Sequence, residues 1–386
     1  MSLRTLSYKQ KLQFIGFLEA ICQELEITEP QYREAQQRYE TIGKWLSDSD
    51  DYRLMSSKIY SQGSIRLGTT VKPIGHEEFD VDLVCHLKCV NRDAFPRDIN
   101  KLVGDRLREN EKYGNMIEPL KRGWRINYAN EFHLDITPSI KNPQCQNGGE
   151  LVPDRKLQDW KSSNPLGYAK WFESHAALQP YIQMEMAAKA EVEPFPGQSG
   201  FKGVLKRSVQ LFKRHRDVYF QYKNSEIKPI SIIITTLAAK SYKNCVGNTI
   251  YSSELDLLMD IIKGMEDFII IHNDNGKRIY MVPNETTAGE NFAEKWNTDH
   301  RHADAFYEWK KAAFSTLSNL WALEGWDVII AKMSESFGQR LVGRSVSKYN
   351  QSIDDARTNK TLAVIPGIGL STNKGIRVRR NTFFGK

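Results

Sequence analysis

The sequence predicts an α+β fold, in which a mixed sheet backed by helices is followed by a mostly helical second lobe. Apolar and polar residues alternate over 79–87 and again over 131–140, and a period of two is typical of strands. Apolar residues recur at helical spacing through much of 165–340, which predicts the second lobe. With 386 residues, the chain is long enough for two or three domains.

The composition is ordinary for a globular protein, with 40% hydrophobic and 26% charged residues. The longest apolar run, 230–239, is too short to span a bilayer, and the N-terminus lacks the apolar core of a signal peptide. We therefore expect a cytoplasmic protein with no membrane partner. Its five scattered cysteines do not form a disulfide framework. The net charge of +7 suits a polyanionic ligand, although it does not separate nucleotides from nucleic acid.

Two helices are expected over residues 8–48, where apolar residues recur at helical spacing up to about residue 26. The second helix begins at Thr28, because a threonine followed three residues later by Gln31 is the pattern of a capping box. Pro30 falls in the first turn, where no intrahelical hydrogen bond is lost. Both are expected to be amphipathic packing helices.

The predicted core follows in alternating elements. A strand at 56–62 leads to a Gly-Ser turn, a short helix or turn at 64–70 and a loop at 71–75. The strand at 79–87, a helix at 95–110 and a strand at 122–128 come next, and Asn130 supplies the turn into the strand at 131–140. Residues 141–165 are rich in Asn, Gly, Pro and Gln, which predicts a loop.

Carboxylates on these strands are the candidate catalytic residues. Asp80 and Asp82 project to the same face, because alternate residues of a strand do so. Two adjacent carboxylates repel unless a cation lies between them, and Mg²⁺ prefers such hard oxygen ligands together with phosphates. Asp-x-Asp alone is common in loops, but Asp135 on a second strand adds a third acid. The turn at Gln62, Gly63 and Ser64 offers backbone N–H groups and a hydroxyl to a triphosphate.

The predicted helical lobe begins at Asn164, a candidate N-cap. Residues 201–222 form a strongly basic helix that contains Lys213, and such a face is often merely solvated. Further helices are expected after Pro229, over 255–271 and over 300–330. Ser231 lies at the start of one of them, either as an ordinary N-cap or as an anion ligand. Residues 345–386 are polar and basic and are expected to be flexible.

The set of Gly63-Ser64, Asp80-x-Asp82 and Asp135 resembles the polymerase-β-type nucleotidyltransferase core. Later segments resemble the cGAS/DncV-like nucleotidyltransferases (CD-NTases) of bacterial anti-phage signalling: the phrase at 164–168, the phrase at 211–217 around Lys213, the helix start at Ser231 and the phrases at 282–287 and 290–296. One departure is Glu285, which stands where the family often has proline.

The resemblance implies N-terminal helices and a catalytic core at 1–160, a helical lobe at 161–344, an active site between them and a flexible tail at 345–386. It implies that Asp80, Asp82 and Asp135 hold Mg²⁺, with Mn²⁺ as a substitute. Donor-nucleotide binding falls to Gln62, Gly63, Ser64, Lys213 and Ser231. The implied product is a cyclic di- or trinucleotide messenger plus pyrophosphate, made from ATP, GTP, UTP or CTP and read by a downstream effector.

The resemblance also implies regulatory or tail-conjugating partners, since Phe384-Gly385 is similar to the tail glycine that some systems conjugate, although Lys386 follows it. A disordered basic tail is the alternative. For the activity, two alternatives stay open: linear, template-free synthesis of an oligonucleotide, and a catalytically silent nucleotide sensor. The presence of all three acids argues against the sensor.

Overall fold

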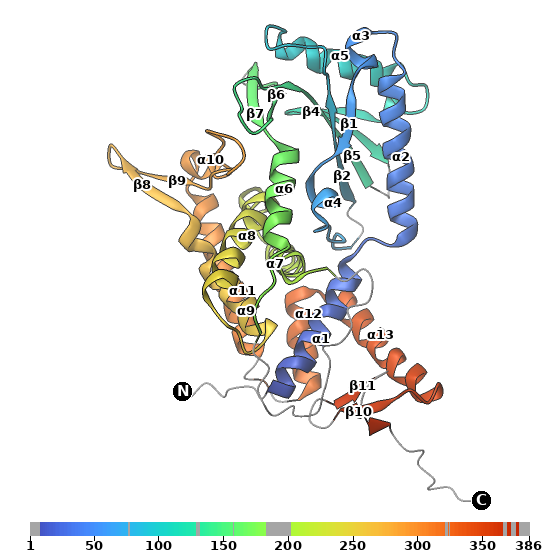
Figure 1. Cartoon of the computed structure of the whole chain (residues 1–386), viewed down its shortest axis with the longest axis vertical. Helices are drawn as coiled ribbons and strands as arrows, with labels where there is room; N and C mark the ends of the chain where they lie inside the picture. Colours follow the sequence, from blue (N-terminus) through green and yellow to red (C-terminus); the bar gives the residue numbers. More distant parts are fainter. Residues whose placement is uncertain are drawn as a thin grey trace, which may run out of the picture.

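The computed structural model describes residues 8–75, 78–128, 132–156, 158–182, 202–320, 323, 325–365, 369–371 and 376–377. It has a sheet-containing core at one end and a helical lobe at the other (Figure 1). The two buried apolar clusters match this division, one in the sheet layer and one among the helices. Within the described ranges, none of the helices combines the length and apolar character that crossing a bilayer requires.

The core is a seven-stranded mixed sheet with the order β1-β2-β5-β4-β3, which β6 and β7 extend by pairing from β5. β2 and β5 run parallel, and the other neighbours are antiparallel. The strands are β1 (Lys58–Ser61), β2 (Phe79–His86), β3 (Ile117–Leu120), β4 (Gly123–Tyr128), β5 (Phe132–Lys141), β6 (Glu150–Asp154) and β7 (Asp159–Ser163).

Helices α2 (Glu29–Ser47) and α5 (Pro96–Arg108) cover the apolar face of this sheet. Ile42 of α2 and Val103 of α5 are completely buried together with Leu83 and Ile136 from the strands. The sheet therefore buries one face and leaves the other for polar residues. Short helices connect these elements: α3 (Tyr52–Met55), α4 (Gly63–Leu67) and η1 (Gly114–Met116).

The start of α2 confirms the predicted capping box. The Thr28 backbone N–H donates to Gln31 Oε1 at 2.9 Å, and the Gln31 backbone N–H donates to Thr28 Oγ1 at 3.4 Å. Helix α1 (Tyr8–Leu25) ends before this cap. Both helices bury an apolar side as expected, but α1 packs in the helical lobe, where Ile21 and Leu25 are buried, and α2 packs on the sheet. The predicted boundary at residue 160 therefore does not coincide with the division between the two buried clusters, because α1 precedes it but packs in the helical lobe.

The predicted loop at 141–165 is wrong, because β6 and β7 lie there. Residues of β6 are buried along its whole length, and Leu151 pairs with Ile140 of β5. Most of the turn residues that suggested a loop lie at 142–149, between β5 and β6. The sheet thus extends to within one residue of Asn164, whose side chain caps α6 by accepting a hydrogen bond from the Gly167 N–H at 2.9 Å.

The helical lobe surrounds α7, which contacts α1, α6, α8, α9, α11 and α12. Its helices are α6 (Pro165–Ala176), α7 (Val204–Phe220), η2 (Ser225–Ile227), α8 (Ser231–Asn248), α9 (Glu254–Gly264), η3 (Met265–Phe268), α10 (Glu294–Thr298), α11 (Arg301–Leu320), α12 (Trp326–Phe337) and α13 (Gln339–Thr358). The predicted helix at 255–271 ends early, because β8 (Ile270–Asp274) and β9 (Lys277–Met281) form a hairpin. Its turn, Asn275-Gly276, has positive φ at both residues.

Two expectations for the C-terminal part are also wrong. The predicted helix over 300–330 ends at Leu320, and α12 begins at Trp326. The predicted flexible tail from 345 begins inside α13, where Leu341, Ser345 and Ala356 are buried against the lobe. A small sheet follows, made of β10 (Ala363–Ile365), β11 (Gly369–Ser371) and β12 (Ile376–Arg377). Phe384-Gly385-Lys386, the segment considered for conjugation, lies outside the described residues.

Candidate active site

The three predicted acids lie on one face of the sheet, at the parallel pair of β2 and β5. Asp82 stands directly opposite Asp135 in the register, and Asp80 is two residues before Asp82 on the same face. The intervening Val81 is buried on the other face. The Asp80 side chain is 55% exposed, whereas that of Asp135 is 16% exposed. The sequence prediction that these carboxylates share a face is therefore confirmed.

The Gly-Ser turn packs directly on Asp82. The Gln62 backbone N–H donates to the Asp82 carbonyl at 2.9 Å, and the Gln62 side chain donates to Thr137 Oγ1 at 3.3 Å. Gly63 has a φ of +64°, and a Cβ at this position would overlap the Asp82 carboxylate. Glycine is therefore required for both the backbone conformation and the close approach. The Ser64 hydroxyl accepts a hydrogen bond from Thr70 Oγ1 at 3.5 Å.

Arg125 is a site residue that the sequence reasoning missed. It lies on β4 directly opposite Asp135, and its Nε and Nη2 donate to the two Asp135 oxygens at 2.6 and 2.8 Å. Its Nη2 also donates to Asp80 Oδ1 at 3.1 Å. The available signal was the hairpin itself, because a turn centred on residue 130 places residue 125 opposite residue 135.

The electrostatics of the site are dominated by its crowded carboxylates. Burial, together with the negative charges of Asp135 and Asp80, raises the pKa of Asp82 to about 7, and the positive charges of Arg125 and Lys213 oppose this shift. Burial and the charge of Asp135 also raise the pKa of Asp80. The hydrogen bonds to Asp135 raise the pKa of Arg125. Two acids are thus held in surroundings that favour a nearby cation.

The residues fit a hard divalent cation by their chemistry. Carboxylate oxygens on adjacent strands are the ligands that Mg²⁺ and Mn²⁺ prefer. In the described part of the chain, however, no three acidic, histidine or cysteine side chains converge as a ready metal cluster. Arg125 instead contacts two of the three carboxylates.

Lys213 lies on α7 and faces the loop that follows α4. Its Nζ donates to the Thr69 carbonyl at 3.1 Å and to Thr69 Oγ1 at 3.0 Å. Burial and the positive charge of Arg216 lower the pKa of Lys213 to about 7, while Asp217 and Asp82 oppose this shift. Lys213 is therefore coupled electrostatically to the acids, but the contacts that fix it are with the loop.

The solvated basic face that the sequence suggested for α7 is wrong for its central part, since four consecutive residues from Lys213 to Arg216 are buried. Their polar groups are used inside the protein. Gln210 Nε2 donates to the Thr70 carbonyl at 2.8 Å, and Arg214 Nη1 donates to the Lys72 carbonyl at 3.3 Å. With Lys213, these side chains hold the backbone of loop 69–72. No sequence pattern indicated this set, because a buried lysine or arginine cannot be distinguished from an exposed one by its spacing.

Ser231 is the first residue of α8, and Ile230 is the N-cap, so the N-cap alternative for this serine is wrong. Its hydroxyl accepts a hydrogen bond from Arg216 Nη1 at 3.0 Å. The same Nη1 donates to the Pro229 carbonyl at 2.9 Å. Ser231 is thus linked to Arg216, one turn along α7 from Lys213.

The Asn284–Asn291 segment builds a joint between the lobes. Asn284 Nδ2 donates to Glu290 Oε2 at 2.7 Å within the segment, and Asn147 Nδ2, between β5 and β6 of the core, donates to the Thr286 carbonyl at 3.5 Å. Glu285, the departure from the family pattern, forms an ion pair with Lys240 at 2.6 Å. These contacts give the segment an architectural function.

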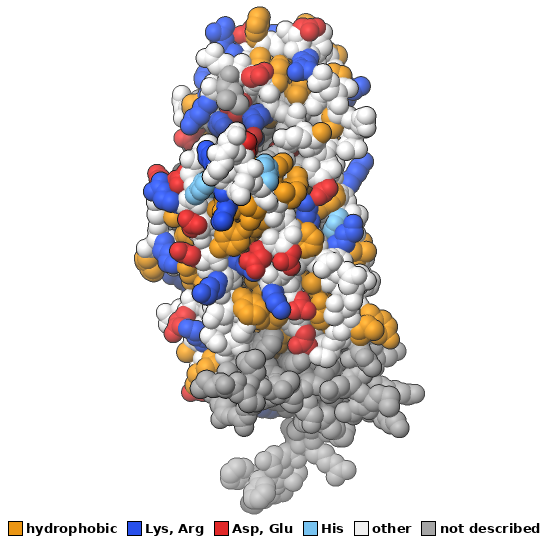
Figure 2. Space-filling model, turned by 90° about the vertical axis from the view of Figure 1, so that its left-hand side faces the viewer, with side chains coloured by type: hydrophobic (Ala, Val, Ile, Leu, Met, Phe, Trp, Pro, Cys, Tyr) orange, Lys and Arg blue, Asp and Glu red, His pale blue; other side chains and the backbone are white. Residues whose placement is uncertain are grey.

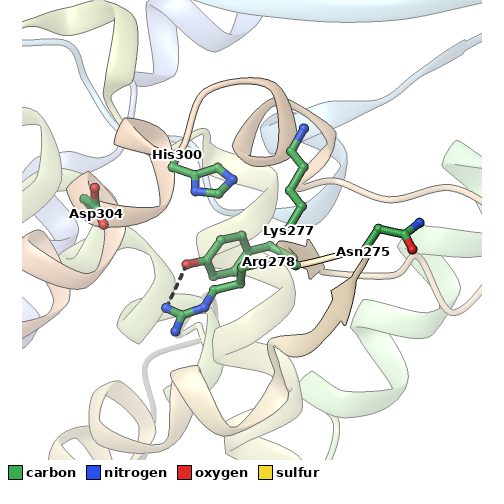
Figure 3. A pocket seen from close by; sticks show the side chains of 7 residues that line it. Asn275, Lys277, Arg278, His300 and Asp304 are labelled. Carbon is green, nitrogen blue, oxygen red and sulfur yellow. Dashed lines mark hydrogen bonds between the residues drawn. The ribbon is translucent and has the colours of Figure 1, made fainter.

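A cavity of about 540 Å³ lies between the β8–β9 hairpin and the start of α11 (Figure 3). Arg278 Nη1 donates to the Tyr280 hydroxyl there at 3.5 Å. None of the predicted site residues lines it, so this cavity is separate from the acids. The lining residues are Asn275, Gly276, Lys277, Arg278, Tyr280, His300 and Asp304.

Comparisons with known proteins identify the family and the fold. Residues 14–175 match the family described as the Second Messenger Oligonucleotide or Dinucleotide Synthetase domain. The chain is 31% identical over 381 residues to a c-di-GMP synthase of Roseivirga ehrenbergii, covering 97% of this chain and 98% of that protein. It is 25% identical over 352 residues to the cyclic dinucleotide synthase CdnG of Bradyrhizobium diazoefficiens, covering 83% and 80% of the two chains. The structure of the Bradyrhizobium diazoefficiens CD-NTase CdnG in complex with GTP has a TM-score of 0.65 at 19% identity, covering 87% of this chain and 98% of that one, so the fold is shared.

Proposed function

The chain belongs to the cGAS/DncV-like nucleotidyltransferases, and we propose that its carboxylates at the β2–β5 pair join two GTP molecules into a cyclic dinucleotide. The family makes cyclic oligonucleotide second messengers in anti-phage signalling. Guanine is proposed as the base because the relative with 31% identity is named a c-di-GMP synthase.

One observation carries the assignment of the site. Asp82 lies opposite Asp135, and Gly63 packs against the Asp82 carboxylate, so the N-terminus of α4 adjoins the acids, and the first N–H groups of a helix have no intrahelical partner. A triphosphate placed on this turn lies beside the carboxylates, where nucleotidyl transfer requires it. In Figure 2, Lys and Arg side chains are interspersed with Asp and Glu over the face shown, a distribution unlike the basic stripe of a nucleic-acid binder.

Each residue has a proposed part in the reaction. Asp80, Asp82 and Asp135 hold Mg²⁺, or Mn²⁺ in its place, which when bound neutralises charge on the phosphates and activates the attacking hydroxyl. Asp135 also helps to take the proton from that hydroxyl. Gln62, Gly63 and Ser64 hold the donor triphosphate, while Lys213 and Ser231 support it from the helical lobe.

The chemistry proceeds by two equivalent transfers. The hydroxyl of one nucleotide attacks the α-phosphorus of the other, a P–O bond forms, and the bond to the leaving pyrophosphate breaks. A second transfer within the linear intermediate closes the ring and releases a second pyrophosphate. Catalysis depends mainly on positioning and on charge stabilisation by fixed groups.

The test is product analysis with the full chain. The protein is incubated with each labelled NTP and with all combinations plus Mg²⁺, followed by phosphatase, nuclease mapping and mass spectrometry. We expect GTP alone to give a phosphatase-resistant product with the mass of cyclic di-GMP. Asp82→Asn abolishes it, and Asp105→Asn, on the exposed side of α5, retains it.

Other outcomes contradict the proposal in identifiable ways. A phosphatase-sensitive ladder indicates linear synthesis, and a cyclic product without guanine refutes the proposed base. No product from any NTP combination with Mg²⁺ or Mn²⁺ favours the silent sensor. Activity that survives in the Asp82→Asn variant refutes the assignment of the acids.

A further inference from the structure

Arg125 lies within the acid cluster and uses the atoms that a metal ion needs. Its guanidinium engages both oxygens of Asp135, at 2.6 and 2.8 Å, and reaches Asp80 Oδ1 at 3.1 Å. Forked pairs between arginine and a carboxylate are strong and geometrically specific. They are stronger still here, because the Asp135 side chain is only 16% exposed.

The backbone fixes this arrangement. Arg125 and Asp135 are direct cross-strand partners in the antiparallel pair of β4 and β5, and Asp135 is the direct partner of Asp82 in the parallel pair. Side chains at paired positions lie side by side on one face of a sheet. The register of the adjacent strands β4, β5 and β2 thus places the Arg125 guanidinium beside the three acids.

We propose that Arg125 is the counter-ion of this acid cluster and competes with the divalent cation for Asp135 and Asp80, so that metal loads together with nucleotide and not before it. The inference rests on the proposed function, in which these acids hold the metal. A triphosphate supplies additional oxygen ligands and negative charge, which favour the exchange. The released guanidinium is then free to pair with a phosphate, a group that its planar fork also matches.

A different role for Arg125 predicts the opposite change in metal affinity when the arginine is removed. If Arg125 only oriented Asp135 toward the metal, its removal would loosen the ligand and weaken metal binding. If Arg125 competes, its removal takes a positive charge away from the cation position and frees both Asp135 oxygens, so metal binding tightens. The direction of the change therefore separates the two roles without any measurement of activity.

The experiment is a Mn²⁺ titration of the full chain, followed by electron paramagnetic resonance of the free ion. We expect Arg125→Gln to bind Mn²⁺ at least about tenfold more tightly than the wild type without nucleotide. Arg125→Lys keeps the positive charge but cannot bind both Asp135 oxygens at once, so its Mn²⁺ affinity should lie between those of the wild type and Arg125→Gln. It provides a second test if the glutamine variant folds poorly. The difference between wild type and Arg125→Gln shrinks when a non-hydrolysable GTP analogue is present.

Arg122→Gln is the matched control, because Arg122 precedes the same strand but pairs with Asp154. It changes the net charge equally, and we expect an effect below about twofold, because distant charges are screened by salt. Equal or weaker Mn²⁺ binding by both Arg125 variants overturns the inference. If instead Asp82→Asn fails to weaken Mn²⁺ binding in the Arg125→Gln background, the proposed metal site itself is wrong.

Discussion

Gly63 lies against the carboxylate of Asp82, and a Cβ on residue 63 would sit 3.0 Å from its carboxylate carbon and overlap Oδ2. The turn and the acid are also joined through the backbone, since the Gln62 N–H donates to the Asp82 carbonyl at 2.9 Å. The position of the turn and that of the acid are therefore not independent, and a change at Gly63 acts directly on Asp82.

We expect Gly63→Ala to lower the rate of product formation at least about 100-fold, because a displacement of roughly 1 Å at a reacting centre has that effect. Gly148→Ala is the control, since Gly148 also has a positive φ, of +73°, but nothing lies within 4 Å of its added Cβ. Each variant loses about 1 kcal/mol of unfolding free energy through backbone strain, and only the first loses activity. Near-normal rates in Gly63→Ala contradict the proposed packing.

The Lys213→Met variant distinguishes a role in binding the donor nucleotide from a role in stabilising the folded protein. The variant loses two hydrogen bonds to Thr69 but also removes the cost of burying an ammonium group, so the unfolding free energy changes by less than about 1 kcal/mol. We expect the KM for the donor nucleotide to rise about tenfold or more, measured in steady-state kinetics. Lys310→Met, at a buried lysine of α11 that pairs with Glu266 and not with Thr69, leaves the KM unchanged. A KM that does not change in Lys213→Met removes this lysine from the donor site.

Stability depends on pH through His215, since burial lowers its pKa to about 4. Between pH 6.5 and 4 the unfolded chain binds a proton at His215 that the folded chain does not, so the contribution of His215 to stability rises with pH across this window and is constant above it. The change amounts to about 3 kcal/mol. Urea unfolding at several pH values gives the unfolding free energy as a function of pH. Between pH 4 and 6.5 this free energy should rise less steeply with pH in His215→Phe than in the wild type. His272→Gln, at an exposed histidine, is the control. Identical slopes in all three proteins contradict the buried, neutral imidazole.

Helix α13 provides a test of the C-terminal structure, because Leu341 is buried against the lobe. Leu341→Ala should lower the unfolding free energy by about 2–5 kcal/mol, as expected for a leucine removed from a core. Ser347→Ala, on the exposed side of the same helix, should have little effect. If the two variants unfold at the same denaturant concentration, α13 does not contribute to the core.

The parts predicted from sequence are those that local chemistry determines. Thr28 and Gln31 form a cap through their own side chains, and Asp80 and Asp82 share a face because of the strand period alone. The pairing of Asp135 with Asp82 joins residues that are distant in sequence. However, the alternation of apolar and polar residues around each acid was enough to predict that both side chains lie on the polar face of the sheet.

The parts that were missed depend on partners distant in sequence. The buried strand β6 follows a run of turn residues, which made the whole segment resemble a loop. Helix α13 is polar except where it packs against α1 and α12. Arg125 and the buried cations of α7 have meaning only once their neighbours are known, since a sequence pattern cannot distinguish a buried, bonded arginine from a solvated one.

Loop 69–72 is covalently part of the core, yet Gln210, Lys213 and Arg214 fasten it to the helical lobe. Any rotation between the lobes must therefore pull on this loop and, through the five residues of α4, on the turn beside Asp82. The orientation of the helical lobe is thereby mechanically linked to the reacting end of the sheet. A partner that binds far from the acids and shifts that lobe would change the position of the turn beside Asp82, and so the rate of catalysis, without contacting a substrate.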